Sequence, residues 1–135
     1  MVRNQFSWPV QIYYEDTDSG GVVYHSNYLN FMERARTEWL RSLKINQQIL
    51  KKELNLLFVV HQINIKFIKP AIFNDLIDVE TALKQLTSVR VKLEQHIKRN
   101  HDLLITASVV IVGVNARTFK PVRIPEQIKS LMECK

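Results

Sequence analysis

The chain has 135 residues, of which 46% are apolar and 24% are charged, and it carries a formal net charge of +6. This length predicts one domain, residues 1–135, and the composition excludes disordered, collagen-like and low-complexity proteins. We expect a cytoplasmic protein, because the sequence shows neither a membrane-spanning segment nor a signal-peptide core, and its single cysteine, Cys134, excludes an internal disulfide.

The N-terminal third predicts a strand, a loop and a long helix. Alternating apolar and polar side chains predict the strand at Trp8–Tyr14, and the turn formers EDTDSGG after it predict the loop. The helix is predicted at Asn27–Leu43, with its charged residues, Arg36 among them, largely on the exposed surface. Its apolar residues recur at helical spacings: Tyr28, Met32, Ala35, Trp39 and Leu43. A stripe this broad predicts a helix packed against a sheet.

The remaining chain predicts mainly strands. A short helix is expected at Asn46–Leu54 and another in the tail, Pro125–Lys135, and RNHD (99–102) is typical of a hairpin turn. Alternating patterns predict strands at 62–67, 77–84 and 89–98, and an apolar run predicts one at 103–112. The element order indicates an α+β fold, an antiparallel five-stranded sheet wrapped around the long central helix.

The strand Leu103–Val112 is apolar at nearly every position, so both of its faces are expected to be covered. Leu103, Ile105, Val109 and Ile111, or their neighbours, would otherwise form an exposed apolar stripe. We therefore predict a homo-oligomer, a dimer or a dimer of dimers. The alternative is that the short helix 46–54 or the C-terminal tail covers the second face within one subunit.

The loop between the first strand and the long helix is the best candidate for chemistry. It combines three acidic residues, two adjacent glycines and His25, directly before a helix N-terminus whose unpaired N–H groups can hold an oxyanion. Asp18 and His25 are the candidates for acid–base or nucleophilic catalysis, whereas Glu15 and Asp16 fit solvation or the helix dipole. No histidine has a second ligand at a metal-like spacing, so we expect no metal site.

The segment QIYYEDTDSGGVVYHSNYLNFMERAR (11–36) resembles the signature of the hotdog-fold acyl-CoA thioesterases. It is most similar to the 4-hydroxybenzoyl-CoA thioesterase-like family, in the YbgC branch that is associated with the Tol-Pal system. The resemblance implies the hotdog fold and the hydrolysis of acyl-CoA to a free acid and coenzyme A, without a cofactor.

The resemblance also implies roles for particular residues. Asp18 falls at the family's catalytic aspartate, acting as general base or nucleophile, and the amides that polarise the carbonyl fall near Val23 and Tyr24. His25 and Tyr14 stand at positions proposed to matter in this branch. A positive surface would help to bind the coenzyme A phosphates, for which the candidates are Arg90, Lys92, Arg117 and Lys120.

Two other functions stay open at this point. A hotdog dehydratase would act on a hydroxyacyl thioester, and a non-catalytic module would only bind acyl-CoA or nucleic acid. We expect no nucleic-acid partner, because the sequence lacks a basic motif interleaved with aromatic residues. The resemblance further implies a homotetramer, association with an acyl carrier protein, and a location at the periphery of the inner membrane.

Overall fold

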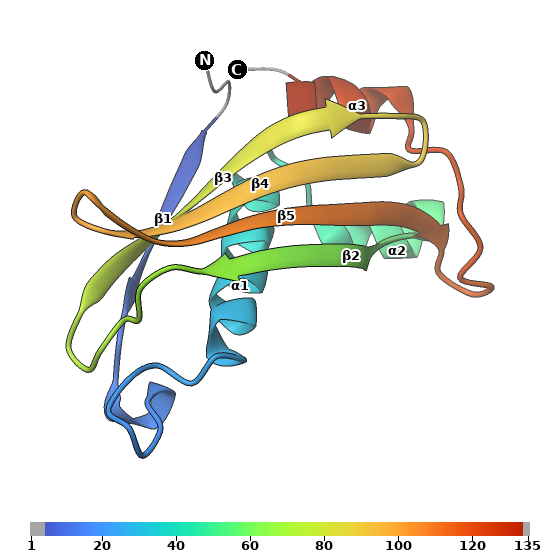
Figure 1. Cartoon of the computed structure of the whole chain (residues 1–135). Helices are drawn as coiled ribbons and strands as arrows, with labels where there is room; N and C mark the ends of the chain where they lie inside the picture. The colour runs from blue at the N-terminus through green and yellow to red at the C-terminus, as the bar shows by residue number, and fades with distance from the viewer. Residues whose placement is uncertain (1–4, 134–135) are drawn as a thin grey trace.

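A computed structural model describes residues 5–133, which form one curved antiparallel sheet wrapped around a helix (Figure 1). The strand order is β1-β3-β4-β5-β2, and every neighbouring pair is antiparallel. The strands are β1 (Phe6–Gln11), β2 (Leu56–Phe67), β3 (Leu76–Leu86), β4 (Arg90–Arg99) and β5 (Asp102–Asn115). The predicted hotdog arrangement of the α+β class is confirmed. A two-residue turn joins β4 to β5 with Asn100 at φ 58, as the RNHD pattern predicts.

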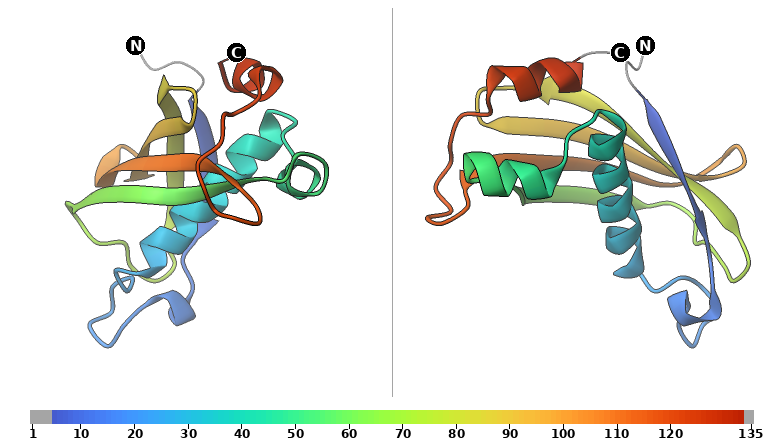
Figure 2. Two further views of the ribbon diagram at one scale, coloured as in Figure 1. Left: turned by 90° about the vertical axis from the view of Figure 1, so that its right-hand side faces the viewer. Right: turned by 180° about the vertical axis from the view of Figure 1, so that it is seen from behind.

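Within residues 5–133, three α-helices lie on the inner side or at one end of this sheet (Figure 2). The long helix α1 (Asn27–Ser42) crosses the inner face, while α2 (Gln47–Leu54) and α3 (Glu126–Glu133) close one end. The side chain of Asn46 caps α2 by accepting the N–H of Gln48 at 2.9 Å. All three predicted helices are present within one to two residues, except that 134–135, with Cys134, lie outside the described residues. No helix in 5–133 is long and apolar enough to cross a membrane.

The core divides into two clusters along α1. The N-terminal half of the helix contributes Tyr28, Phe31, Met32 and Ala35 to a cluster with β1, β3 and the ends of β4 and β5. Its C-terminal half contributes Trp39 and Leu40 to a second cluster that α2 and α3 cover. The loop between β1 and α1, residues 12–26, is called the functional loop below. It contributes Ile12 and Val23 to the first of these clusters.

Arg36, expected on the surface, is buried to 8% exposure between the two clusters. Its guanidinium donates to Oε1 of Gln95 at 3.0 Å, and Gln95 Nε2 donates to Met32 O and to Thr81 Oγ1. The helical pattern places Arg36 beside Ala35, and the long side chain reaches from there to the middle of β4. Burial lowers the pKa of Arg36, an effect that the nearby Glu33 carboxylate opposes.

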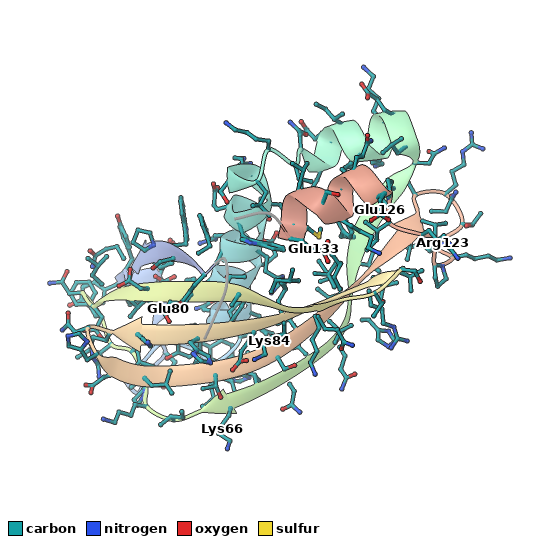
Figure 3. The ribbon with its side chains drawn as sticks, turned by 90° about the horizontal axis from the view of Figure 1, so that it is seen from above. Lys66, Glu80, Lys84, Arg123, Glu126 and Glu133 are labelled. Atoms are coloured by element: carbon teal, nitrogen blue, oxygen red, sulfur yellow. The ribbon has the colours of Figure 1, made fainter. Side chains whose placement is uncertain are left out.

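The faces of β5 differ from the expectation that both are apolar and need a cover. Ile105, Val109 and Ile111 are buried within the protomer, because this face points to α1. The opposite face presents Thr106 and Ser108 together with Val110 and Val112, and the neighbouring strands add lysines to it: Lys66, Lys84 and Lys92. Figure 3 shows Lys66 on the side of the sheet away from the helices. The outer face of β5 is therefore mixed, with Thr106 and Ser108 in its first half and Val110 and Val112 in its second.

Candidate active site

The chain leaves the sheet earlier than the sequence predicts and forms a turn before α1. The predicted strand runs to Tyr14, whereas β1 ends at Gln11, although the Ile12 N–H still donates to Asp75 O at 2.8 Å in the register that pairs Gln11 with Leu76. The Asp16 carboxylate then accepts the Tyr13 N–H at 2.8 Å and closes a 3-10 turn over Tyr14–Asp16. Tyr14 is consequently 73% exposed, and its ring stacks on Phe73 at 3.8 Å between centroids.

Asp18 occupies the first position of a tight hairpin. Thr17 pairs with Val23, the Asp18 N–H donates to Val22 O, and the Gly21 N–H donates to Asp18 O. Gly21 has φ 84, a conformation that favours glycine, so this residue makes the reversal possible. The adjacent glycines thus serve the geometry of the acid that precedes them.

The Asp18 carboxylate is oriented on one side and open on the other. Oδ1 accepts the Gly20 N–H at 2.8 Å, which fixes the side chain over the hairpin. Oδ2 has no hydrogen-bond partner among residues 5–133, and Asp18 is exposed. The exposed oxygen can accept a proton from water or attack an electrophile without first breaking a bond to the protein.

The backbone amides before α1 are not equally available. The Val23 N–H donates to Ala71 O and the Tyr24 N–H donates to Asp16 O, both at 2.9 Å, so both expected oxyanion donors are already engaged. Within 5–133 the N–H groups of His25 and Ser26 have no acceptor. The first free amides at the helix N-terminus therefore come one residue later than the sequence suggests.

A pocket of about 320 Å³ lies at this helix end. Its lining is mainly apolar and includes one lysine. The lining residues are Val23, His25, Tyr28, Phe67, Ile68, Lys69 and Pro70. His25 is exposed, and among the described residues its ring nitrogens make no hydrogen bond. The pocket therefore adjoins the His25 amide and imidazole together.

The loop 68–75 supports the pocket and the functional loop at once. Ala71 accepts the Val23 N–H through its carbonyl and donates its own N–H to the Tyr28 hydroxyl at 2.9 Å. Asp75 holds the loop, since its Oδ2 accepts both the Ile72 N–H and Nη1 of Arg99. This network ties the functional loop to the end of β4.

The cationic residues proposed for coenzyme A do not reach this pocket within one protomer. Arg99 marks the end of β4 near the pocket, because it bonds to Asp75 in the loop 68–75. Arg90 lies at the opposite end of β4, roughly 30 Å away at the usual rise per residue. Lys92 lies near the same far end, and Arg117 and Lys120 follow the far end of β5. Lys69 is the cation that lines the pocket, paired with Asp102 at 3.8 Å.

Sequence reasoning missed Tyr28, Phe67 and Lys69 as pocket residues. The helical spacing accounts for the burial of the Tyr28 ring, but it gives no indication of what its hydroxyl contacts. Phe67 and Lys69 come from a strand end and a loop that only the fold brings to the helix N-terminus. No group of three or more metal-binding side chains occurs among the described residues.

Comparisons with known proteins agree with one another. A family profile described as the thioesterase-like superfamily matches residues 13–131. An acyl-CoA thioesterase YbgC from Haemophilus influenzae is 45% identical over 130 residues, 96% of each chain. An acyl-CoA thioester hydrolase YbgC from Escherichia coli is 40% identical over 124 residues, 91% of this chain and 92% of that one. The crystal structure of a probable thioesterase from Bartonella henselae superposes with a TM-score of 0.85 at 36% identity, covering 90% and 99% of the chains.

Proposed function

The chain belongs to the thioesterase-like superfamily and is an acyl-CoA thioester hydrolase related to YbgC, and we propose that Asp18 is the carboxylate that carries out the hydrolysis. The observation that carries this proposal is the hairpin that orients Asp18 Oδ1 and leaves Oδ2 open, a few residues before the free amides of α1. A carboxylate and a helix N-terminus on one short segment are the two parts that thioester hydrolysis needs.

The carbonyl oxygen of the thioester binds at the His25 N–H, where the helix dipole is positive. This assignment replaces Val23 and Tyr24, whose N–H groups bond within the protein. A negative charge develops on this oxygen as the carbonyl carbon becomes tetrahedral, and a preorganised N–H stabilises the charge without reorganisation of water.

Two routes lead from this geometry to the products. As a general base, Asp18 takes a proton from water while the water oxygen bonds to the carbonyl carbon. The intermediate then collapses, the C–S bond breaks, and the coenzyme A thiolate leaves with the bond electrons. As a nucleophile, Asp18 itself displaces the thiolate to give a mixed anhydride, which water hydrolyses to the acid.

The His25 imidazole and Tyr14 have supporting parts in this proposal. His25 lines the pocket, so its ring can donate to the carbonyl oxygen or to the water, or orient Asp18. Tyr14 stacks on Phe73 and thereby joins the functional loop to the loop 68–75. The arrangement needs no cofactor, because a thiolate is already a good leaving group.

Release of free thiol from acyl-CoA tests the function directly. The purified protein is incubated with acyl-CoAs of increasing chain length and with benzoyl-CoA, and the freed coenzyme A is measured with a thiol reagent. Crotonyl-CoA belongs in the same series, since its hydration without thiol release would favour the dehydratase. A protein that binds acyl-CoA and releases no thiol would be the binding module.

We further propose that two protomers pair through β2. β1 and β2 are the edges of the sheet, but β1 has six residues with Pro9 among them, which cannot donate to a ladder. β2 runs for twelve residues without proline or glycine. Val60, Phe67 and Ile68 along and after it are 47–51% exposed. Since Phe67 and Ile68 also line the pocket, pairing there places the active site at the subunit boundary.

Oligomeric state is tested by sedimentation or light scattering at micromolar concentration. We expect a dimer, or the dimer of dimers that makes a homotetramer, and a shift toward monomer in Val60→Lys, because an edge charge opposes pairing. A fully active wild-type protein of 15.9 kDa would overturn both the dimer and the shared site.

The wider partners remain proposals that rest on the resemblance. Association with the Tol-Pal system, an acyl carrier protein or the cytoplasmic side of the inner membrane finds support in the net charge of +6, which favours acidic surfaces. Cosedimentation with vesicles of anionic and of zwitterionic phospholipid separates a charge-driven membrane association from none. Binding to neither kind of vesicle contradicts the membrane proposal.

A further inference from the structure

Tyr28 is the buried polar residue of the pocket that the proposed function does not use. It is the second residue of α1 and is 2% exposed. Its ring meets Phe31 edge-on at 6.2 Å between centroids and Phe67 at 5.9 Å. These contacts fix the ring, and the position of the hydroxyl with it, beside the Ala71 N–H in the wall of the pocket that His25 also lines.

Among residues 5–133, the Tyr28 hydroxyl accepts a hydrogen bond but donates none. Its oxygen accepts the Ala71 N–H at 2.9 Å, whereas its hydrogen has no acceptor among residues 5–133. A buried hydroxyl that donates to nothing is unfavourable and is rare in folded proteins. Because Tyr28 lines the pocket, a molecule in the pocket can supply the missing acceptor.

The charges around Tyr28 keep it protonated. Burial raises the pKa of the phenol above its ordinary value, and the Asp75 and Asp18 carboxylates raise it further. The Ala71 hydrogen bond and the Arg99 charge act in the opposite direction and are outweighed. His25 and Lys69 complete the ionisable groups of the pocket. The phenol is therefore a donor at neutral pH.

We propose that the Tyr28 hydroxyl donates a hydrogen bond to the carbonyl oxygen of the bound thioester, as a second donor beside the His25 N–H. This inference rests on the proposed function. No proton is transferred, and the phenol stays neutral throughout. The bond strengthens as charge develops on the carbonyl oxygen, so it stabilises the transition state more than the substrate and makes Tyr28 a catalytic residue.

A non-hydrolysable analogue reads this hydrogen bond directly. The probe is an acyl-CoA in which a methylene replaces the thioester sulfur, with ¹³C at the carbonyl. We expect the ¹³C signal to move downfield on binding to the wild-type protein, because hydrogen bonds polarise the carbonyl. The shift should shrink in Tyr28→Phe, which keeps the ring and loses the hydroxyl.

Site-specific 3-fluorotyrosine at position 28 separates a catalytic role from a structural one. The fluorinated phenol still accepts the Ala71 N–H, but it is a more acidic donor, so the downfield shift should exceed that of the wild-type protein. Tyr28→Phe should lower kcat about 10²–10³-fold, the usual cost of one oxyanion donor, with little change in KM. Tyr13→Phe is the matched control, since Tyr13 is 61% exposed and lies outside the pocket, and it should change neither readout.

The outcomes distinguish this inference from the function on which it rests. A hydroxyl that only supports Ala71 would leave the carbonyl signal equal in the wild-type, Tyr28→Phe and fluorotyrosine proteins, which overturns the proposal for Tyr28 alone. A wild-type protein that binds no analogue and hydrolyses no acyl-CoA overturns both. Full activity of Asp18→Asn together with a reduced ¹³C shift in Tyr28→Phe removes Asp18 and retains Tyr28.

Discussion

Both halves of α1 carry apolar residues at helical spacings, but the N-terminal half borders the candidate active site, whereas the C-terminal half packs only against other core residues. In the N-terminal half, the cluster around Phe31 and Met32 borders loops in which Tyr14 and Tyr24 are 73% and 47% exposed. In the C-terminal half, Trp39 and Leu40 are nearly inaccessible, because α2, α3 and the segment before α3 close over them. One end is left open where its backbone amides are unpaired, and the other is sealed by packing.

This difference indicates where substitutions should act on the rate and where on folding. At the open end the candidate catalytic side chains of Asp18 and His25 are exposed, so their removal costs little packing. Groups at the sealed end have no path to the substrate, so their removal creates cavities. The comparison fails if a substitution at one end produces the effect that belongs to the other.

Asp18→Asn should give the largest effect at the open end. The amide oxygen can still accept the Gly20 N–H, so the hairpin is retained, but the base or nucleophile is lost. We expect kcat to fall about 10²–10⁴-fold, the range for a positioned base, with an unchanged melting temperature. Glu15→Gln in the exposed 3-10 turn just before Asp18 is the control and should keep its rate. Near wild-type hydrolysis by Asp18→Asn would remove Asp18 from the mechanism.

Trp39→Ala should give the corresponding effect at the sealed end. Trp39 is 1% exposed, and its replacement leaves a cavity that should cost about 3–5 kcal/mol of unfolding free energy. Chemical denaturation measures this loss, and kcat per folded molecule should stay the same. Trp39→Phe should cost much less, because Nε1 of Trp39 is buried and has no hydrogen-bond partner among residues 5–133. A large fall in kcat of the folded Trp39→Ala protein would show that the halves are coupled.

His25→Ala sharpens the division of roles within the open end. The backbone N–H at position 25 remains in this variant, so the carbonyl oxygen keeps a donor while the imidazole is lost. We expect kcat to fall by less than in Asp18→Asn, at most about 10²–10³-fold. Steady-state rates of the two variants, measured on one substrate, decide the order. A His25→Ala enzyme slower than Asp18→Asn reverses the roles of the two residues.

The sequence predicts the elements of this fold well because periodicity reports burial. The stripe of α1 and the alternation in β3 and β4 depend only on which side faces the core. The end of β1 was not predictable in this way, since the chain turns away from β3 after Ile12, where the Asp16 carboxylate accepts the Tyr13 N–H. The second face of β5 is less apolar than the sequence run indicates, because its two polar residues, Thr106 and Ser108, both lie on that face beside Val110 and Val112.

The site shows the same limit. The loop motif identifies Asp18 and His25 as candidates through residue type and through the resemblance. Which amide is free depends on Ala71 and Asp16 as acceptors for Val23 and Tyr24, and a linear motif does not contain that partnership. Pocket residues such as Phe67 lie at the end of β2. Nothing in the sequence around Phe67 indicates that the fold brings it to the N-terminus of α1.

Arg36 lies where the two halves of α1 meet, and its substitution should have the smallest effect of those considered. Arg36→Met removes the guanidinium donor to Gln95 Oε1, which stays buried, so we expect a loss of about 1–3 kcal/mol of unfolding free energy. Adding Gln95→Leu removes that acceptor as well, but it also takes the Nε2 donor from the buried Thr81 hydroxyl, so it should restore only part of the stability. Denaturant titration of the two variants measures both steps.

The rate of these variants then tells what the polar network does. If Arg36 and Gln95 only join the two clusters, the double variant should hydrolyse acyl-CoA at the wild-type rate once folded. If they hold α1 in the register that presents the His25 amide, kcat should fall while unfolding free energy recovers. The network touches Met32 O in the open half and Thr81 on the neighbouring strand, yet it lines no part of the pocket. We therefore expect recovery of stability without loss of rate, which keeps the chemistry at one end of the helix.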